Sequence, residues 1–245
     1  MSDPRAASFG AIAEDYERGR PGWPERVAEI AELPADAVVL DLAAGTGKLT
    51  RVLARHFAGV IAVEPDDALR ELIPGDVETL AGAAEEIPLA DASVDGVFCA
   101  EAFHWFDAPR AVAEIARVLR PCGSLVVCFN TDGGATAPRW PDEARAVIER
   151  HRPPGEVGGR HLVDAGTWRD TFAAAPFEPL RFETATHEHV QSREEAISQL
   201  LSISGFALLP ESEREEMRVE LRNVLPETTW RTPMLAEIWS TRRLP

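Results

Sequence analysis

Residues 38–50 read VVLDLAAGTGKLT, and this stretch decides how the rest of the chain is interpreted. Its apolar start predicts a short buried strand over Ala37–Asp41. Gly45 and Gly47 then predict a tight turn, because glycine adopts backbone angles that a Cβ atom disfavours. An amphipathic helix follows the turn. The free N–H groups at its start favour an anionic or electron-rich ligand group.

Further apolar runs predict four more strands in the first half, at Val60–Glu64, Val77–Ala81, Val94–Ala100 and Ser124–Phe129. Amphipathic segments separate them, including a helix that Asp107 caps. Apolar strands that alternate with helices indicate a parallel sheet covered on both faces. The second half predicts a strand at Arg181–Val190, helices at Arg193–Leu208 and Glu211–Leu225, and a last, antiparallel strand at Pro233–Ser240.

The expected fold is therefore a Rossmann-like, doubly wound, seven-stranded and mostly parallel sheet with the last strand antiparallel, plus helical lid or insert elements. We expect a single domain over residues 1–245. Its cofactor-binding core would span about 35–130, and residues 1–34 and about 131–231 would contribute cap and substrate elements. Ligands of open α/β sheets bind at the carboxyl ends of the strands.

Composition excludes several classes of protein. The chain has 245 residues, of which 45% are hydrophobic, and a formal net charge of −16. This charge disfavours a nucleic-acid partner and an anionic membrane surface. No signal peptide and no membrane-spanning run are visible, and the three cysteines lack CxxC spacing. We therefore expect a cytoplasmic protein with free thiols and no metal site. The oligomeric state cannot be read from the sequence.

Two acidic residues favour a particular cofactor. Glu64 ends the second predicted strand, where a carboxylate accepts both hydroxyls of a ribose. Asp41 would oppose a pyrophosphate but suits an ammonium or sulfonium group. A dinucleotide fingerprint would also place a glycine at Thr50. These residues favour S-adenosylmethionine (SAM), which carries both cationic groups and no phosphate.

Several segments together resemble the class I SAM-dependent methyltransferases of the type 11 group. Residues 38–50 resemble motif I, and the similarity continues through VEPDDALR (63–70), AGAAEEIPLADASVDGVFCAEAFHWFD (81–107) and RVLRPCGSLVV (117–127). FGAIAEDYERGRPGWP (9–24) resembles the lead of relatives near the trans-aconitate methyltransferases. The resemblance covers about residues 8–130 strongly and the rest weakly.

Three positions depart from the family pattern. Ala43 replaces the usual first glycine of motif I, which narrows the room for the methionine end of SAM. Cys122 replaces the second glycine of the turn before the fifth strand. Ala83 stands where some relatives carry an aspartate, so backbone groups near Ala84 and Glu85 would hold the adenine.

The resemblance implies a set of cofactor-binding residues: Tyr16, Arg20, Asp41, Ala43, Gly45, Thr46, Gly47, Glu64, Pro65, Ala84, Glu85, Ala100 and Glu101. Within it, Asp41 and the two glycines would line the methionine part, Glu64 the ribose, and Ala100 and Glu101 the sulfonium side. Tyr16 and Arg20 share a helix face at i, i+4 spacing. Arg20 would pair the SAM carboxylate or an acidic substrate, or would be an ordinary surface arginine.

The run from Ala102 to Phe106 is the candidate substrate side. His104 could remove a proton from a nucleophile, and His104 and Trp105 could wall a substrate pocket; the alternative is that His104 binds backbone and the aromatic rings are core. His187 and His189 lie on one strand face as a possible metal pair, although a solvated face is the simpler interpretation. Ser202–Ser204 could line a pocket or occupy ordinary polar helix positions.

The expected function is methyl transfer from SAM to an oxygen, nitrogen or carbon nucleophile of a small molecule, with S-adenosylhomocysteine (SAH) as product. A carboxylic acid is one candidate acceptor. Two alternatives remain from the sequence. One is a Rossmann oxidoreductase dependent on NAD(P), and the other is a non-catalytic SAM-binding protein.

Overall fold

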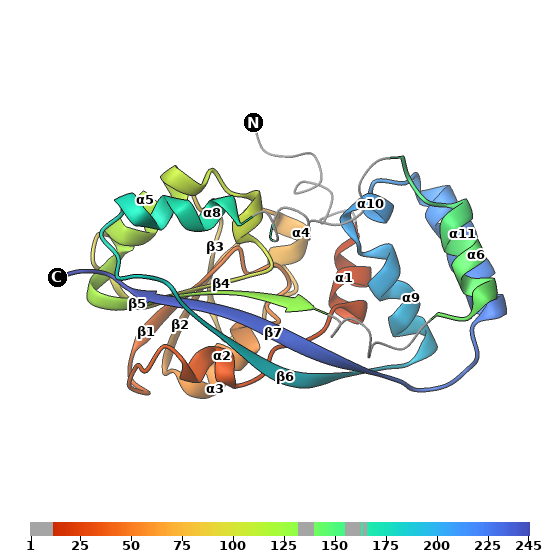
Figure 1. Cartoon of the computed structure of the whole chain (residues 1–245), viewed down its shortest axis with the longest axis horizontal. Helices are drawn as coiled ribbons and strands as arrows, with labels where there is room; N and C mark the ends of the chain where they lie inside the picture. Colours follow the sequence, from red (N-terminus) through yellow and green to blue (C-terminus); the bar gives the residue numbers. More distant parts are fainter. Residues whose placement is uncertain (1–11, 132–139, 155–162, 164–165) are drawn as a thin grey trace.

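The computed structural model describes residues 12–131, 140–154, 163 and 166–245, so residues 9–11 of the N-terminal motif lie outside the described residues. A seven-stranded sheet occupies the centre, in the order β3-β2-β1-β4-β5-β7-β6 (Figure 1). Its strands are β1 (Val38–Leu42), β2 (Gly59–Val63), β3 (Glu78–Leu80), β4 (Val94–Ala100), β5 (Leu119–Thr131), β6 (Arg181–Gln191) and β7 (Trp230–Arg242).

The pairing of the strands confirms the predicted sheet. β1 to β5 are parallel, and β7 runs antiparallel to β5 on one side and to β6 on the other. The chain first builds outward from β1 to β3 and then crosses back to β4, so β1 and β4 flank the point where the winding reverses. Ligands of such sheets bind at this point, beyond the carboxyl ends of the strands.

Helices cover both faces of the sheet. On one side α5 (Ala108–Val118) packs with α8 (Thr167–Asp170) and two single turns, η3 (Phe103–Trp105) and η5 (Thr171–Ala174). On the other side α2 (Arg26–Glu29) and α3 (Thr50–His56) bury their apolar residues. α4 (Asp67–Arg70) follows β2. The strands can be apolar on both faces because each face is covered.

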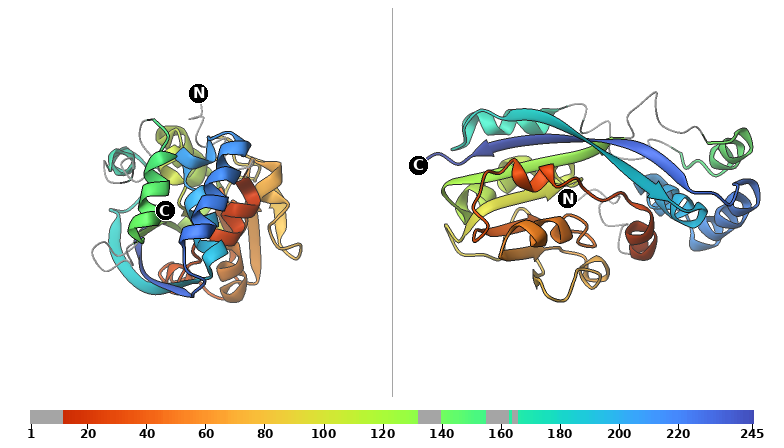
Figure 2. Two further views of the ribbon diagram at one scale, coloured as in Figure 1. Left: turned by 90° about the vertical axis from the view of Figure 1, so that its right-hand side faces the viewer. Right: turned by 90° about the horizontal axis from the view of Figure 1, so that it is seen from below.

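A second apolar core lies beyond the sheet. It joins α6 (Asp142–Arg150), α9 (Arg193–Leu201), α10 (Ser204–Ala207) and α11 (Glu211–Val224). β6 and β7 extend past the other strands to reach these helices (Figures 1 and 2). α1 (Ala13–Gly19) lies against α9, and a Cβ atom at Gly19 would come within 2.0 Å of the Gln199 nitrogen. We call α1, α6, α9, α10 and α11 the cap.

The structure corrects three expected boundaries. The single helix expected over Arg193–Leu208 is two helices, because Ile203 is extended and separates α9 from α10. β5 begins at Leu119 and not at Ser124, since the turn through Cys122 belongs to the strand. β7 runs over Trp230–Arg242, longer than the expected Pro233–Ser240, because it pairs along its length with β5 and β6.

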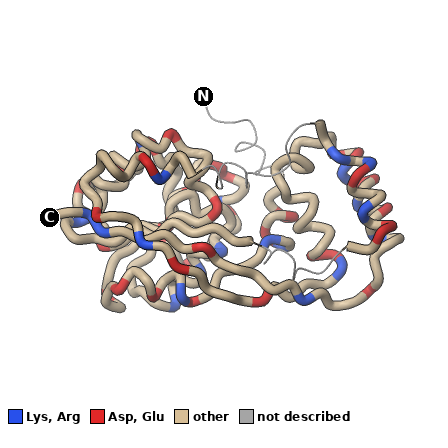
Figure 3. Tube along the Cα trace, viewed as in Figure 1, with Lys and Arg blue, Asp and Glu red and all other residues tan. Residues whose placement is uncertain are grey.

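Charged residues of both signs alternate along α6 and α11 (Figure 3). Arg150 binds Glu220 at 2.6 Å, and Arg222 binds Glu194 at 2.7 Å, so ion pairs join neighbouring cap helices. These pairs are partly exposed, and each contributes little to stability. Within the described part of the chain, no helix combines the length and the apolar character that a membrane crossing requires.

Candidate active site

Two adjoining cavities open where β1 and β4 end. One, of about 400 Å³, extends under the cap and is called the cap cavity here. The other, of about 440 Å³, extends toward the end of β2 and is called the β2 cavity. Both volumes are typical of small-molecule sites. The residues that line both cavities form a shared wall: Tyr16, Ala43, Gly45, Ala100, Glu101 and Trp105.

The backbone of this wall is locally strained. Ala43, Gly45 and Glu101 all have φ near +57°. A residue with a Cβ atom pays about 1–2 kcal/mol in this left-handed region. Cys122, in the turn within β5, has a φ of +63°. At Ala43 and Cys122 this chain lacks a glycine that the family pattern has. The positive φ at both positions is the physical reason why glycine suits them.

Gly47 has a different environment from Gly45. Its φ is +81°, and it lies outside the lining of both cavities. A Cβ atom there would approach the Pro74 Cδ to 3.0 Å and the Ile73 Cα to 3.3 Å. Gly47 therefore lets the loop pack closely against the segment after α4, and its contact with a cofactor stays a prediction.

Asp41 lies at the end of β1 with only 1% of its surface exposed. Its Oδ2 accepts a hydrogen bond of 2.6 Å from the Thr50 hydroxyl, whereas its Oδ1 has no hydrogen-bond partner. The buried Thr46 Oγ1 also lacks a partner. Both oxygens belong to residues that line the cap cavity. Buried oxygens without partners fit a ligand that brings polar groups, as the ammonium and carboxylate of SAM would.

Burial raises the pKa of Asp41 to about 7, opposed by the hydrogen bond from Thr50 and reinforced by the negative charge of Glu64. A cationic ligand favours the ionised carboxylate, so SAM binding below that pKa must release a proton. We expect the affinity for SAM to rise about tenfold between pH 6 and pH 8, and Asp41→Asn to remove much of that rise. Calorimetric titration at both pH values measures it. The same pH slope in wild type and Asp41→Asn would contradict this role.

Glu64 follows β2 and lines the β2 cavity together with Pro65, Ala84 and Glu85. It is 5% exposed, and burial raises its pKa. Its carboxylate accepts hydrogen bonds from the Gly45 N–H at 2.9 Å and the Asp66 N–H at 3.0 Å. The predicted ribose-binding residue therefore also fixes the glycine loop. The Glu85 carboxylate accepts from the Asp107 N–H at 2.8 Å.

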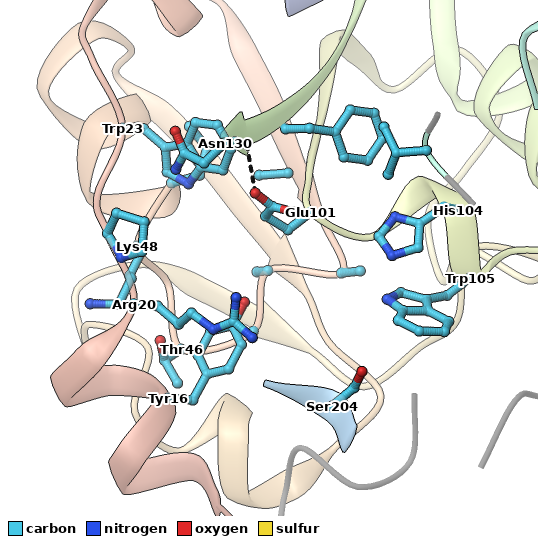
Figure 4. A pocket seen from close by; sticks show the side chains of 18 of the residues that line it. Tyr16, Arg20, Trp23, Thr46, Lys48, Glu101, His104, Trp105, Asn130 and Ser204 are labelled. Atoms are coloured by element: carbon cyan, nitrogen blue, oxygen red, sulfur yellow. Dashed lines mark hydrogen bonds between the residues drawn. The ribbon is translucent and has the colours of Figure 1, made fainter. Parts of the chain in front are cut away.

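Tyr16 of α1 and Arg20, the residue just after that helix, line the cap cavity (Figure 4). Burial raises the pKa of Tyr16 to about 12, so its phenol is neutral. The Arg20 guanidinium lies 5.3 Å from the centre of the Tyr16 ring. Its Nε donates to the Ser202 Oγ at 2.9 Å and its Nη2 to the Ser202 carbonyl at 2.8 Å. Ser202 thus holds Arg20 in place.

Some of the aromatic side chains that follow β4 line the cavities, and one lies in the core. His104 and Trp105 line the cap cavity, and Phe106 lines the β2 cavity. The ring centres of His104 and Trp105 are 4.5 Å apart (Figure 4). Phe103 is fully buried against Trp168. His104 and Trp105 therefore line a cavity, whereas Phe103 belongs to the core; a substrate role for His104 and Trp105 stays a prediction.

The sequence did not indicate that the end of β5 contributes a residue to the site. Asn130 lines the cap cavity, and its backbone N–H donates to the Glu101 Oε1 at 2.6 Å (Figure 4). Its side-chain Oδ1 lies 2.8 Å from the His187 Nε2. The parallel pairing of β4 and β5 was the available signal, since it brings the carboxyl ends of both strands to one edge.

His187 and His189 connect β6 to other elements. His187 meets Asn130, and the His189 Nε2 lies 3.0 Å from the Gly19 carbonyl at the end of α1. Burial lowers the pKa of both imidazoles. Within the described ranges no three His, Cys, Asp or Glu side chains group as metal ligands.

Comparison with known proteins agrees with this geometry. A family model described as a methyltransferase domain matches residues 40–127. An uncharacterized methyltransferase-like protein of Schizosaccharomyces pombe is 34% identical over 228 residues, which cover 89% of this chain and 85% of the relative. An uncharacterized methyltransferase of Mycobacterium tuberculosis is 45% identical over 151 residues, which span 60% of this chain and only 61% of that relative.

Among solved structures, a "Putative Type II Methyltransferase" from Anaeromyxobacter dehalogenans is 27% identical and superposes with a TM-score of 0.64 over 92% of this chain and 99% of the other. The chain belongs to the class I SAM-dependent methyltransferases, and SAM is its cofactor. These similarities establish the class and not the trans-aconitate subgroup.

Proposed function

We propose that the chain transfers the methyl group of SAM to a small-molecule acceptor held in the cap cavity. The observation that carries this proposal is the pair of cavities that meet at one shared wall. The β2 cavity has room and polar partners for a nucleoside, and the cap lines part of the other cavity. A nucleoside in the β2 cavity and a methionine end at Asp41 would place the methyl group at this wall, facing an acceptor in the rest of the cap cavity.

We assign the cofactor contacts by position. Pro65, Ala84 and Glu85 would surround the adenine, and Glu64 would accept from the ribose. Asp41 and Thr46 carry the oxygens without partners and would bind the methionine end. Gly45, Ala43 and Ala100 would let the ligand backbone approach closely. Tyr16, Arg20 and Glu101 complete the assignment, with the Glu101 carboxylate near the sulfonium.

The bound cofactor would supply an electrophilic methyl carbon. An oxygen, nitrogen or carbon atom of the acceptor would form a bond to this carbon, and the C–S bond would break with its electron pair left on sulfur. The acceptor would lose a proton. Trp105 would exclude water from this point. His104 is the candidate to take the proton. Arg20 lines the same cavity, and its guanidinium would attract the carboxylate of a carboxylic acid acceptor.

We also propose that different segments of the chain bind SAM and the acceptor. Residues of about 35–130 would hold SAM, and residues 1–34 and about 131–231 would cover the acceptor. The separate apolar core of the cap supports this division. So does α1, which precedes the sheet in sequence and yet packs on α9.

Release of SAH tests the proposal. The purified chain is incubated with SAM labelled in the methyl group and with pools of phenols, carboxylic acids and amines. We expect wild type to form SAH only with a pool that contains an acceptor. Gly45→Val, the variant expected to lose SAM binding, should form none with any pool. SAM binding without SAH release from any pool would favour a non-catalytic SAM-binding protein.

A further inference from the structure

The cap contributes a buried hydroxyl group to the cap cavity. Ser204 begins α10, lines the cavity and is 2% exposed. Its Oγ has no hydrogen-bond partner. In Figure 4 the hydroxyl lies on the side of the cavity where Trp105 is found. Burying an unpaired hydroxyl is unfavourable, so a polar ligand atom would satisfy it.

This hydroxyl is separate from the polar groups assigned to SAM. Among the described residues that line the cap cavity, the other buried side-chain oxygens without partners are the Asp41 Oδ1 and the Thr46 Oγ1, both at the cofactor loop. Ser204 comes instead from the cap, just after the break at Ile203 that divides α9 from α10. Its position therefore suits the acceptor and not the donor.

The residues that line the cap cavity indicate the shape of that acceptor. Several are aromatic or apolar, namely Trp23, Trp105, Phe129, Ile203 and Met234, and others are polar or charged, including Lys48 and Gln199. Flat, apolar rings pack well against the aromatic and apolar side chains. Arg20 lines the same cavity, with its Nε and Nη2 bound to Ser202. The carboxylates of the cavity, Asp41 and Glu101, come from the carboxyl-terminal ends of β1 and β4.

We propose that Ser204 is a specificity-determining residue, whose Oγ–H donates a hydrogen bond to an oxygen substituent of a small acceptor with a flat ring. The inference rests on the proposed function and deepens it. A hydroxyl or carbonyl oxygen would satisfy Ser204. A hydrocarbon of the same shape leaves the hydroxyl unpaired, and an amidinium cation only donates hydrogen bonds and so cannot accept its proton.

Three probes with the same planar centre next to the ring test this assignment: acetophenone with a carbonyl oxygen, α-methylstyrene with a methylene group in its place and benzamidine with a cationic amidinium group. Each is titrated into the SAH-saturated chain, and binding is followed by NMR. We expect acetophenone to bind about tenfold more tightly than the other two in wild type. Ser204→Ala should abolish the difference between acetophenone and α-methylstyrene and leave the SAH affinity unchanged within about twofold.

Ser212→Ala is the matched control, because Ser212 is exposed on α11; it should retain the wild-type preference. Ligand-free Ser204→Ala should melt no lower than wild type, since it loses only an unpaired hydroxyl, whereas a structural role predicts a lower melting temperature. SAH binding without the acetophenone preference, or with the preference intact in Ser204→Ala, overturns the assignment. Failure to bind SAH at all would instead overturn the proposed function.

Discussion

Replacing Gly45 with valine is expected to abolish measurable SAM binding while the chain still folds. Gly45 has a φ of +57°, and its Cβ would point to the Tyr16 ring at 3.8 Å, within the wall shared by both cavities. A β-branched residue in the left-handed region costs more than alanine does. The new side chain would also occupy the space proposed for the ligand. We expect the affinity to fall by at least about a hundredfold, as measured by calorimetry with SAH.

Two variants serve as controls for this loss. Gly75→Val makes the same change where a Cβ atom meets nothing within 4 Å and φ is ordinary, so it should bind SAH like wild type. Gly45→Ala should retain weak binding, because Ala43 already tolerates the same backbone angle in the same loop. Normal SAH affinity in a folded Gly45→Val chain would show that this loop does not hold the cofactor.

The second large effect is expected at Glu64. Glu64→Ala would leave the Gly45 and Asp66 N–H groups without their acceptor, and would also remove the proposed partner of the ribose hydroxyls. The expected loss of SAM binding is about 1–3 kcal/mol, or about five- to 150-fold in affinity. Calorimetry well below the melting temperature separates this loss from unfolding.

Glu64→Gln keeps the shape and one accepting oxygen, so its affinity should lie between those of wild type and Glu64→Ala. Glu71→Ala changes an exposed glutamate just after α4 and should bind SAM normally. Equal affinities of Glu64→Ala and wild type would mean that Glu64 binds only the backbone N–H groups and not SAM.

The sheet and the cofactor side of the site could be predicted because local sequence determines them. Apolar runs mark the strands, and parallel winding brings their carboxyl ends to one edge. Strand ends and winding alone therefore predict that Asp41, Glu64 and Ala100 lie at the same edge of the sheet. The positive φ values of Ala43 and Cys122 lay beyond that reasoning, because alanine and cysteine do not signal a left-handed backbone as glycine does.

The cap could not be predicted in the same way because contacts between distant segments form it. Asp15 of α1 accepts from the Ser198 hydroxyl at 2.8 Å and pairs with Arg218 at 2.6 Å. Gly19 packs on the backbone of Gln199. Hydrophobic periodicity reports that a helix has a buried face but not which partner covers it. The roles of Asn130 and Ser204 follow from that assembly and were therefore missed or left open.

We propose that the β2 cavity holds the nucleoside of SAM, and that the cap cavity holds its methionine end together with the acceptor. A crystal structure of the chain with SAH bound tests this arrangement. We expect the adenine among Pro65, Ala84 and Glu85, and the sulfur at the wall between Gly45 and Trp105, with the part of the cap cavity under Ser204 left free. Adenine in the cap cavity, or SAH bound elsewhere on the chain, would contradict it.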